Sequence, residues 1–287
     1  MKNFTRTLVV FICFAFAKAN TAQAQSQIKG IATYQSLTKF NMPKDTTMEK
    51  RAESDPMVRQ IMEQLQKGST NEYQLFFTAA ESSYGKMQEL AKPEAKKDGI
   101  SISFSASDGL GSTIYKDIAQ AKYIKQGNIM GKDFVIEGDL QTYSWELQSE
   151  SKKIGQYTCY KATYKPVKKP AEEEDKKENE APKGLLASMP ERDNTITAWY
   201  TPELAVSNGP GEYHGLPGLI LEINSADTTI LCSSIEMNPS KGFEIKKPKE
   251  GKRVSQEQFD AIQKKKMEEM QERRGGKNGV IIESFGN

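Results

Sequence analysis

A run of glycines and prolines between two strand-like segments constrains this chain more than any other feature. Residues 199–223 hold four glycines, three prolines and the chain's only histidine, His214. Gly-Pro at 209–210 predicts one turn and Gly-Leu-Pro-Gly at 215–218 a second, because glycine tolerates positive φ and proline fixes φ near the turn value. The apolar residues at 219–223 then predict a strand. The segment therefore predicts a rigid joint between two strands.

The first 24 residues are typical of a signal peptide. Lys2 and Arg6 form a positive start, residues 7–17 are apolar, and Ala-Gln-Ala at 22–24 matches a cleavage site. The apolar run is shorter than the ~20 residues that cross a bilayer, and no later stretch is long enough. We therefore expect an exported chain in the periplasm or cell envelope, without a membrane span.

The net charge argues against one class of partner. Without the three basic residues of the leader, 37 basic and 38 acidic residues remain, so the formal charge changes from +2 to −1. Bulk nucleic-acid binding depends on clustered positive charge. A nearly neutral mature chain gives no support for nucleic acid as a partner.

Two cysteines, Cys159 and Cys232, follow the leader. An even count in an exported chain favours one disulfide, and two buried free thiols are the alternative. A bridge requires two strands far apart in sequence to place the Cα atoms within about 7 Å. The sequence leaves both alternatives open.

Short strands dominate the predicted fold. Apolar and polar residues alternate over 27–40 and again over 73–77. Short strands with few helices favour an antiparallel meander over alternating strand–helix units. The sequence therefore predicts an α+β, mainly β fold: a curved antiparallel sheet or half-barrel, with an early helix packed on it and a peripheral C-terminal helix. Further strands are predicted at 100–106, 112–115, 122–130, 134–136, 143–147, 157–164, 219–223 and 228–236.

Both helices have recognisable start signals. An N-cap and proline at 54–56, an apolar stripe and Gly68 predict the early helix over 56–67. A capping-box pattern at 255–258 predicts the second helix over 256–273. Its narrow apolar stripe and many charges indicate a surface helix.

The composition divides the chain into a leader at 1–24, a single β-rich domain at 25–245 and a charged C-terminal helix and tail at 246–287. Within the domain, residues 165–194 carry blocks of like charge, four prolines and few apolar residues. We expect this insert to be disordered, because it has too little to bury. Its acidic cluster at 172–175 is more typical of a solvated run than of a cation site.

Most enzyme classes lack their characteristic residues. A single histidine and two cysteines give no spacing typical of zinc or haem sites, and no G-x-S-x-G elbow accompanies His214. We therefore expect no metal and no cofactor. Glu203, Glu212 and Glu222 lie in the joint or next to it and are candidates for paired carboxylates in a hydrolase. Nothing in their spacing selects two of them.

The joint also resembles a known sequence family. Gly215–Ile220 reads GLPGLI, and it follows AWYTPE at 198–203, a Gly-Pro turn and Tyr213. Together with YTCYKA at 157–162, this pattern resembles the GLPGLI family of exported Bacteroidota proteins over most of the mature chain. The charged insert is longer than the family pattern, and Cys232 is not part of it. The structural motif comprises Gly209, Pro210, Gly215, Leu216, Pro217, Gly218, Leu219 and Ile220.

This resemblance implies little about activity, because the family has no general established one. The glycine-proline pattern before a strand is also similar to half-barrels of the lipoprotein-carrier type, which are antiparallel sheets curled around helices. Ligand binding does not follow from such an analogy, because one fold hosts many functions.

Two functional hypotheses follow. In the first, the chain is a non-enzymatic binding or carrier module for an apolar ligand or an envelope partner, and Trp199, Tyr213 and Leu216 line or close the site. These three residues fill an ordinary core in the alternative interpretation. In the second hypothesis, the chain is a periplasmic hydrolase, which requires two of the three glutamates to face each other at about 5 to 10 Å.

Overall fold

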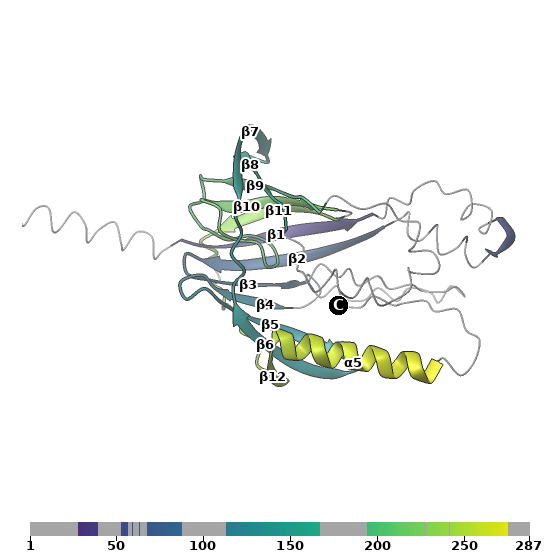
Figure 1. The fold of residues 1–287 in the computed structure, drawn as a ribbon. Coiled ribbons are helices and arrows are strands. Elements are labelled where there is room, and N and C mark those ends of the chain that lie inside the picture. The colour runs from purple at the N-terminus through teal and green to yellow at the C-terminus, as the bar shows by residue number, and fades with distance from the viewer. Residues whose placement is uncertain are drawn as a thin grey trace, which may run out of the picture.

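The computed structural model of the chain describes residues 28–39, 53–56, 59, 63, 68–87, 113–166, 194–226, 228–240 and 242–274. These residues form twelve strands in one open sheet and a C-terminal helix, α5 (Gln256–Arg274), that lies beside one end of the sheet (Figure 1). The mainly β prediction is confirmed, but the half-barrel is not, because the sheet is open. The leader, the predicted strand at 100–106 and most of the charged insert lie outside the described residues.

The sheet has the order β12-β6-β5-β4-β3-β2-β1-β11-β10-β9-β8-β7. In chain order the strands are β1 (Lys29–Thr38), β2 (Ser69–Thr78), β3 (Glu81–Lys86), β4 (Ile114–Asp117), β5 (Lys122–Ile129), β6 (Lys132–Asp139), β7 (Glu146–Ile154), β8 (Tyr157–Tyr164), β9 (Ile196–Thr201), β10 (Leu219–Ser225), β11 (Thr228–Met237) and β12 (Lys252–Ser255).

Two antiparallel meanders make up this sheet. Strands β1 to β6 pair in chain order, and so do β7 to β11. The pairing of β1 with β11, in which Tyr34 lies opposite Cys232, joins the two meanders. The predicted meander is confirmed with one departure, because β12 pairs with β6 in parallel.

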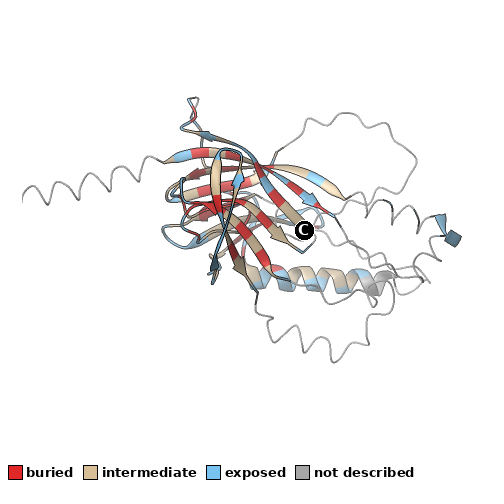
Figure 2. Cartoon of the chain, turned by 90° about the horizontal axis from the view of Figure 1, so that it is seen from above, coloured by how far each residue is buried: buried red, intermediate tan, exposed pale blue. Residues whose placement is uncertain are grey.

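Alternation along the strands separates an inner face from an outer face. The register aligns Ala32, Leu75 and Ile114 across the sheet through β3, and each is at most 1% exposed, which defines the inner face. Phe76 and Tyr115 have the opposite parity and define the outer face. Figure 2 shows buried positions alternating along the strands, whereas α5 is mostly intermediate or exposed.

Helix α5 covers the inner face near β5 and β6. Phe259 packs edge-on against Phe134 with ring centroids 5.5 Å apart. Gly127 fits beneath the Phe259 ring, because a Cβ on residue 127 would lie 2.7 Å from Phe259 Cε2. The capping box is confirmed: Gln258 N donates to Ser255 Oγ at 3.3 Å, and Ser255 N donates to Gln258 Oε1 at 3.1 Å. The predicted peripheral C-terminal helix is thus present and begins at Gln256.

The early helix is only partly within the described residues. Glu53, Ser54, Pro56, Arg59 and Glu63 are helical and exposed. The backbone N–H of Arg59 donates to the carbonyl four residues earlier at 3.1 Å, as in an α-helix. The apolar stripe lies outside the described residues, so the packing of this helix on the sheet is not confirmed.

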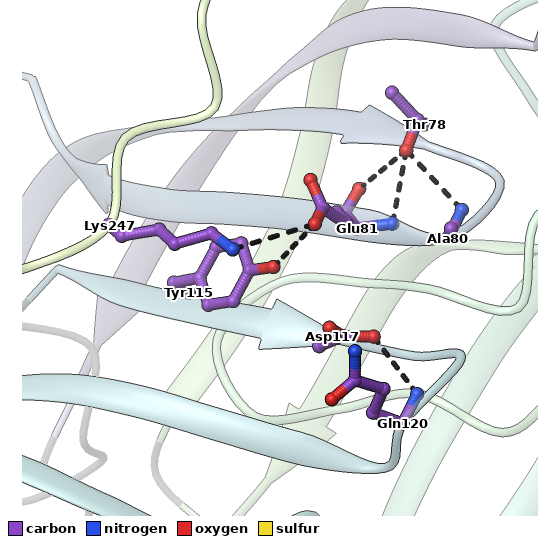
Figure 3. A network of polar contacts seen from close by, with 7 residues as sticks. All are labelled: Thr78, Ala80, Glu81, Tyr115, Asp117, Gln120 and Lys247. Atoms are coloured by element: carbon purple, nitrogen blue, oxygen red, sulfur yellow. Dashed lines mark hydrogen bonds and ion pairs between the residues drawn. The ribbon is translucent and has the colours of Figure 1, made fainter.

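A polar network holds Lys247 on the outer face of the sheet (Figure 3). Tyr115 Oη donates to Glu81 Oε1 at 2.7 Å, and Lys247 Nζ lies 3.6 Å from the same oxygen. The ammonium also lies 4.3 Å from the centroid of the Tyr115 ring, a cation–π contact. Next to it, the Phe243 ring contacts Phe76 at 5.6 Å. These contacts anchor the connection that leads to β12.

Within the described part of the chain, no helix has the length and apolar character needed to span a bilayer.

Candidate functional site

The predicted joint is the loop between β9 and β10, residues 202–218, which we call the β9–β10 loop. Asn208 and His214 form an isolated antiparallel bridge across it, and Ile220 N donates to Asn208 O at 2.9 Å. Gly218 must be a glycine, because a Cβ there would lie 2.1 Å from Thr201 O. Gly215 has a φ of +94°, in the region that favours glycine. These constraints fold the loop back onto the sheet.

The side chain of Lys116 rises from the inner face of β4 into this loop. Lys116 is 0% exposed, and its Nζ donates to Gly209 O at 2.8 Å and to Tyr213 O at 3.1 Å. The Glu212 carboxylate bonds to Lys125 at 2.9 Å instead. Burial penalises the charged form and lowers the pKa of Lys116 to about 7, although Glu212 opposes the shift. The loop is therefore fixed by an amine that is partly neutral near pH 7.

Other polar atoms lie buried in the same region. Ser82 is the cross-strand partner of Lys116. Its Oγ is buried, as are Asn208 Nδ2 and His214 Nε2, and none of the three atoms has a hydrogen-bond partner among the described residues. Buried polar atoms are usually satisfied, and unsatisfied ones often mark ordered water or a functional site. The buried region beneath the loop thus contains more polar atoms than the apolar core around it.

His214 is not placed as a catalytic base. Its ring packs edge-on against Tyr143 at 5.5 Å, and its carbonyl accepts a hydrogen bond from Trp145 Nε1 at 2.9 Å. Burial, together with the nearby Lys116 charge, lowers the pKa of His214 to about 4, although a bond with the Gln141 backbone opposes the shift. The imidazole is therefore neutral near pH 7. No carboxylate from the described ranges orients it as in a catalytic triad.

Tyr143 lies at the centre of a group of five rings that we call the aromatic cluster. Its ring centroid lies 5.3 Å from Trp145, 5.2 Å from Tyr164, 5.8 Å from Tyr213 and 5.5 Å from His214. All five residues are partly exposed. Burial raises the pKa of Tyr143 well above its usual range, so its hydroxyl stays protonated. The cluster joins the start of β7 and the end of β8 to the β9–β10 loop.

The structure does not bring the three predicted binding residues together. Tyr213 belongs to the aromatic cluster, whereas Leu216 is 1% exposed and packs in the core. Trp199 pairs with Glu222 on the outer face of the sheet, and Lys152 Nζ lies 4.3 Å from the centroid of its indole ring. Of the three, only Tyr213 therefore lies where an accessible aromatic surface forms.

Each of the three candidate carboxylates bonds to a different strand. Glu203 accepts a hydrogen bond from the backbone N–H of Thr158 in β8 at 2.8 Å. Glu212 pairs with Lys125 in β5, and Glu222 Oε2 pairs with Lys152 Nζ in β7 at 2.7 Å. These separate partners do not form the facing pair of carboxylates that a glycosidase requires.

The two cysteines are free, buried thiols in the structure. Cys159 lies on β8 and Cys232 on β11, with β9 and β10 between them. Burial raises the pKa of Cys159 to about 11 and that of Cys232 to about 12. The geometry thus corresponds to the free-thiol alternative.

The described ranges contain no candidate metal site. Among those residues, no three histidine, cysteine, aspartate or glutamate side chains form a group that could hold a metal ion.

Sequence reasoning missed Lys116 and most of the aromatic cluster. The predicted strand ended at Tyr115, one residue before Lys116, and no role was predicted for that lysine. Its parity with Ile114 in β4 was the available signal, because alternate residues of a strand share a face. Tyr143 precedes β7 and Tyr164 ends β8, and only tertiary structure brings Tyr143 to Tyr213.

Comparison with known proteins gives a family of unknown function. Residues 145–222 match a family described as "Protein of unknown function (Porph_ging)". No curated protein matches the chain. Two solved structures of PNGF-II, in space groups C2 and P21, superpose with a TM-score of 0.47, at 13% and 12% identity. Each alignment covers 83% of this chain and 33% of the other, so the chain spans about a third of their length. Residues 145–222 are therefore similar to a Bacteroidota-associated family of unknown function, and the GLPGLI assignment is not confirmed.

Proposed function

We propose that the chain is exported to the periplasm or cell envelope and acts there as a non-enzymatic binding module. In this proposal, the aromatic cluster around Tyr143 binds an apolar ligand or an apolar segment of an envelope partner. The convergence of the rings of five partly exposed residues, with four centroids 5.2 to 5.8 Å from that of Tyr143, carries the proposal.

The polar atoms of the cluster support a preformed site. Trp145 Nε1 donates to His214 O at 2.9 Å, and Gln141 Nε2 donates to Tyr164 Oη at 3.2 Å. Rigid aromatic side chains supply contact area at low entropic cost, and a fixed geometry lowers the cost of binding further. The rings are thus held in place before any ligand arrives.

The proposal includes a curved sheet, and the short connection between the meanders supports this part of it. Asp139 ends β6 and Glu146 begins β7, yet these strands lie near opposite ends of the strand order. Seven steps of ~3.4 Å span ~24 Å, whereas ten inter-strand spacings across a flat sheet amount to ~48 Å. Curvature of this kind would direct the aromatic cluster and the β9–β10 loop toward one concave side.

The carboxylate hydrolase receives no comparable support. Glu203, Glu212 and Glu222 bond to separate partners in β8, β5 and β7. His214 faces a tyrosine ring, and its low pKa comes first from burial. Binding without chemistry is therefore the function that the geometry supports best.

Two measurements test the proposal. Native mass spectrometry of the mature protein, purified from its own periplasm, should show a co-purified apolar molecule or peptide. Titration with 8-anilinonaphthalene-1-sulfonate should give a fluorescence increase that Tyr143→Ala weakens at least tenfold in affinity and Tyr143→Phe preserves. Trp199→Phe on the outer face is the matched control and should leave probe binding unchanged. No co-purified molecule, together with probe binding that ignores Tyr143, would disprove the binding module.

A further inference from the structure

We propose that Lys116 acts as a pH-sensitive latch on the β9–β10 loop: when its amine gains a proton, the loop detaches more readily and takes Tyr213 and His214 away from the aromatic cluster. The latch rests on the proposed function, because it regulates the same site. It goes further in naming the group that controls the site and the direction of control.

The latch follows from where the amine bonds. Gly209 O and Tyr213 O, its two acceptors, lie on either side of a turn closed by a hydrogen bond from Tyr213 N to Pro210 O at 3.2 Å. A single amine therefore fastens both ends of this turn to β4. Tyr213 itself and the next residue, His214, contribute two of the five rings. Release of the turn would displace those two rings.

The groups around Lys116 do not compensate its charge directly. From the loop, Glu212 is paired with Lys125 of β5, and His214 is neutral above a pKa of about 4. From β5, Tyr123 is the cross-strand neighbour, and burial raises its pKa to about 12. From β3, Ser82 and Tyr84 contribute hydroxyl groups. Among Lys116 and these neighbours, Lys116 is therefore the group whose charge changes between pH 7 and pH 10.

Linkage fixes the direction of the effect. In the closed loop the pKa of Lys116 is about 7, and in an open loop the solvated amine returns toward its ordinary 10.5. The open state therefore binds more protons between these two values, so a fall in pH favours opening. Between pH 9 and pH 7 the ratio of closed to open loop falls about 50-fold, and below pH 7 it levels off.

Hydrogen–deuterium exchange of the mature protein without ligand tests the latch. Protection of the amides at 205–218, corrected for the intrinsic pH dependence of exchange, should rise about 50-fold from pH 7 to pH 9. Lys116→Met, which keeps an apolar stem of similar length, should show no such rise. Lys122→Met removes an exposed lysine paired with Asp139 on the same sheet, and it should keep the full rise.

A second variant protects the test if Lys116→Met does not fold. Glu212 raises the pKa of Lys116, so Glu212→Gln should shift the midpoint of the protection profile to lower pH. A flat wild-type profile, a rise retained in Lys116→Met or an unmoved midpoint in Glu212→Gln would each overturn the latch. The two proposals fail separately: probe binding with a pH-independent loop defeats the latch alone, and a pH-dependent loop without any binding defeats the proposed function alone.

Discussion

Lys116 in strand β4 and Lys247, which lies next to this strand, have opposite environments. Lys247 lies on the outer face, over the Tyr115 ring and 3.6 Å from Glu81. Its contacts with Tyr115, and then with Glu81, raise its pKa. Lys116, the next residue along β4 after Tyr115, faces inward, is 0% exposed and bonds to two backbone carbonyls, and burial lowers its pKa. The face of the sheet on which each amine lies therefore determines the direction in which its pKa shifts.

The difference shows that solvent exposure determines how much a charged group contributes to the stability of this fold. An exposed ion pair competes with water and salt, so its contribution to stability is small. A buried amine has lost its water, so the protein must supply every hydrogen bond, and loss of a partner leaves polar atoms unsatisfied. The network in Figure 3 should therefore tolerate substitution, whereas the contacts of Lys116 should not.

The largest effect should come from removing the inner lysine. Lys116→Ala leaves a cavity and two buried carbonyls without a donor, so we expect the free energy of unfolding at pH 9 to fall by about 3 to 5 kcal/mol. Urea denaturation followed by circular dichroism measures this change. Lys247→Ala is the outer-face control and should be indistinguishable from wild type. Equal losses in the two variants would break the comparison.

The next effect is the pH dependence of stability. The folded pKa of Lys116 is about 7, below its ordinary 10.5, so the unfolded chain binds more protons between these values and stability rises with pH there. Lys116 should contribute about 2 kcal/mol more stability at pH 9 than at pH 7. Subtracting the profile of Lys116→Met from that of wild type isolates this contribution. A difference profile without slope would show that the amine is solvated in the folded protein.

Strand identity followed from local pattern, because alternation is a property of adjacent residues. The predicted strand at 157–164 coincides with β8, and the predicted strand at 228–236 differs from β11 by one residue. Pairings across the chain had no local signal. The junction of β1 with β11 and the parallel pairing of β12 with β6 depend on residues far apart in sequence.

The candidate site was half predictable for the same reason. Glycine and proline mark the β9–β10 loop directly, and Tyr213 lies inside it. Trp199 and Leu216 were grouped with Tyr213 by proximity in sequence, yet alternation places Trp199 on the outer face and packing buries Leu216 in the core. Tyr143 joins the site only through the path of the chain between the two meanders.

A smaller effect on stability should distinguish Gly209 in the β9–β10 loop from Gly85 on the outer face. A Cβ on Gly209 would lie 2.8 Å from the Cβ of Ile220 and disturb a carbonyl that accepts from Lys116. We expect Gly209→Ala to lower the free energy of unfolding by about 1 to 2 kcal/mol and to weaken the pH dependence, because overpacking lifts the loop. Gly85→Ala on the outer face is the control, because the atom nearest to a Cβ on Gly85 would be Thr113 Oγ1 at 3.1 Å. This variant should lower the free energy of unfolding by less than about 1 kcal/mol. The reverse order would contradict a tightly seated loop.

The smallest effect should be on the outer network itself. Tyr115→Phe removes the hydroxyl that donates to Glu81 Oε1 at 2.7 Å but keeps the ring beneath the Lys247 ammonium. The carboxylate remains partly open to water, so we expect a loss of about 0.5 kcal/mol in the free energy of unfolding. Burial raises the pKa of Tyr115, so its hydroxyl stays protonated at pH 9 and the loss should be the same at pH 7 and pH 9. A loss that grows with pH would mean that solvent does not screen the outer face, and the contrast between the two lysines would then need another cause.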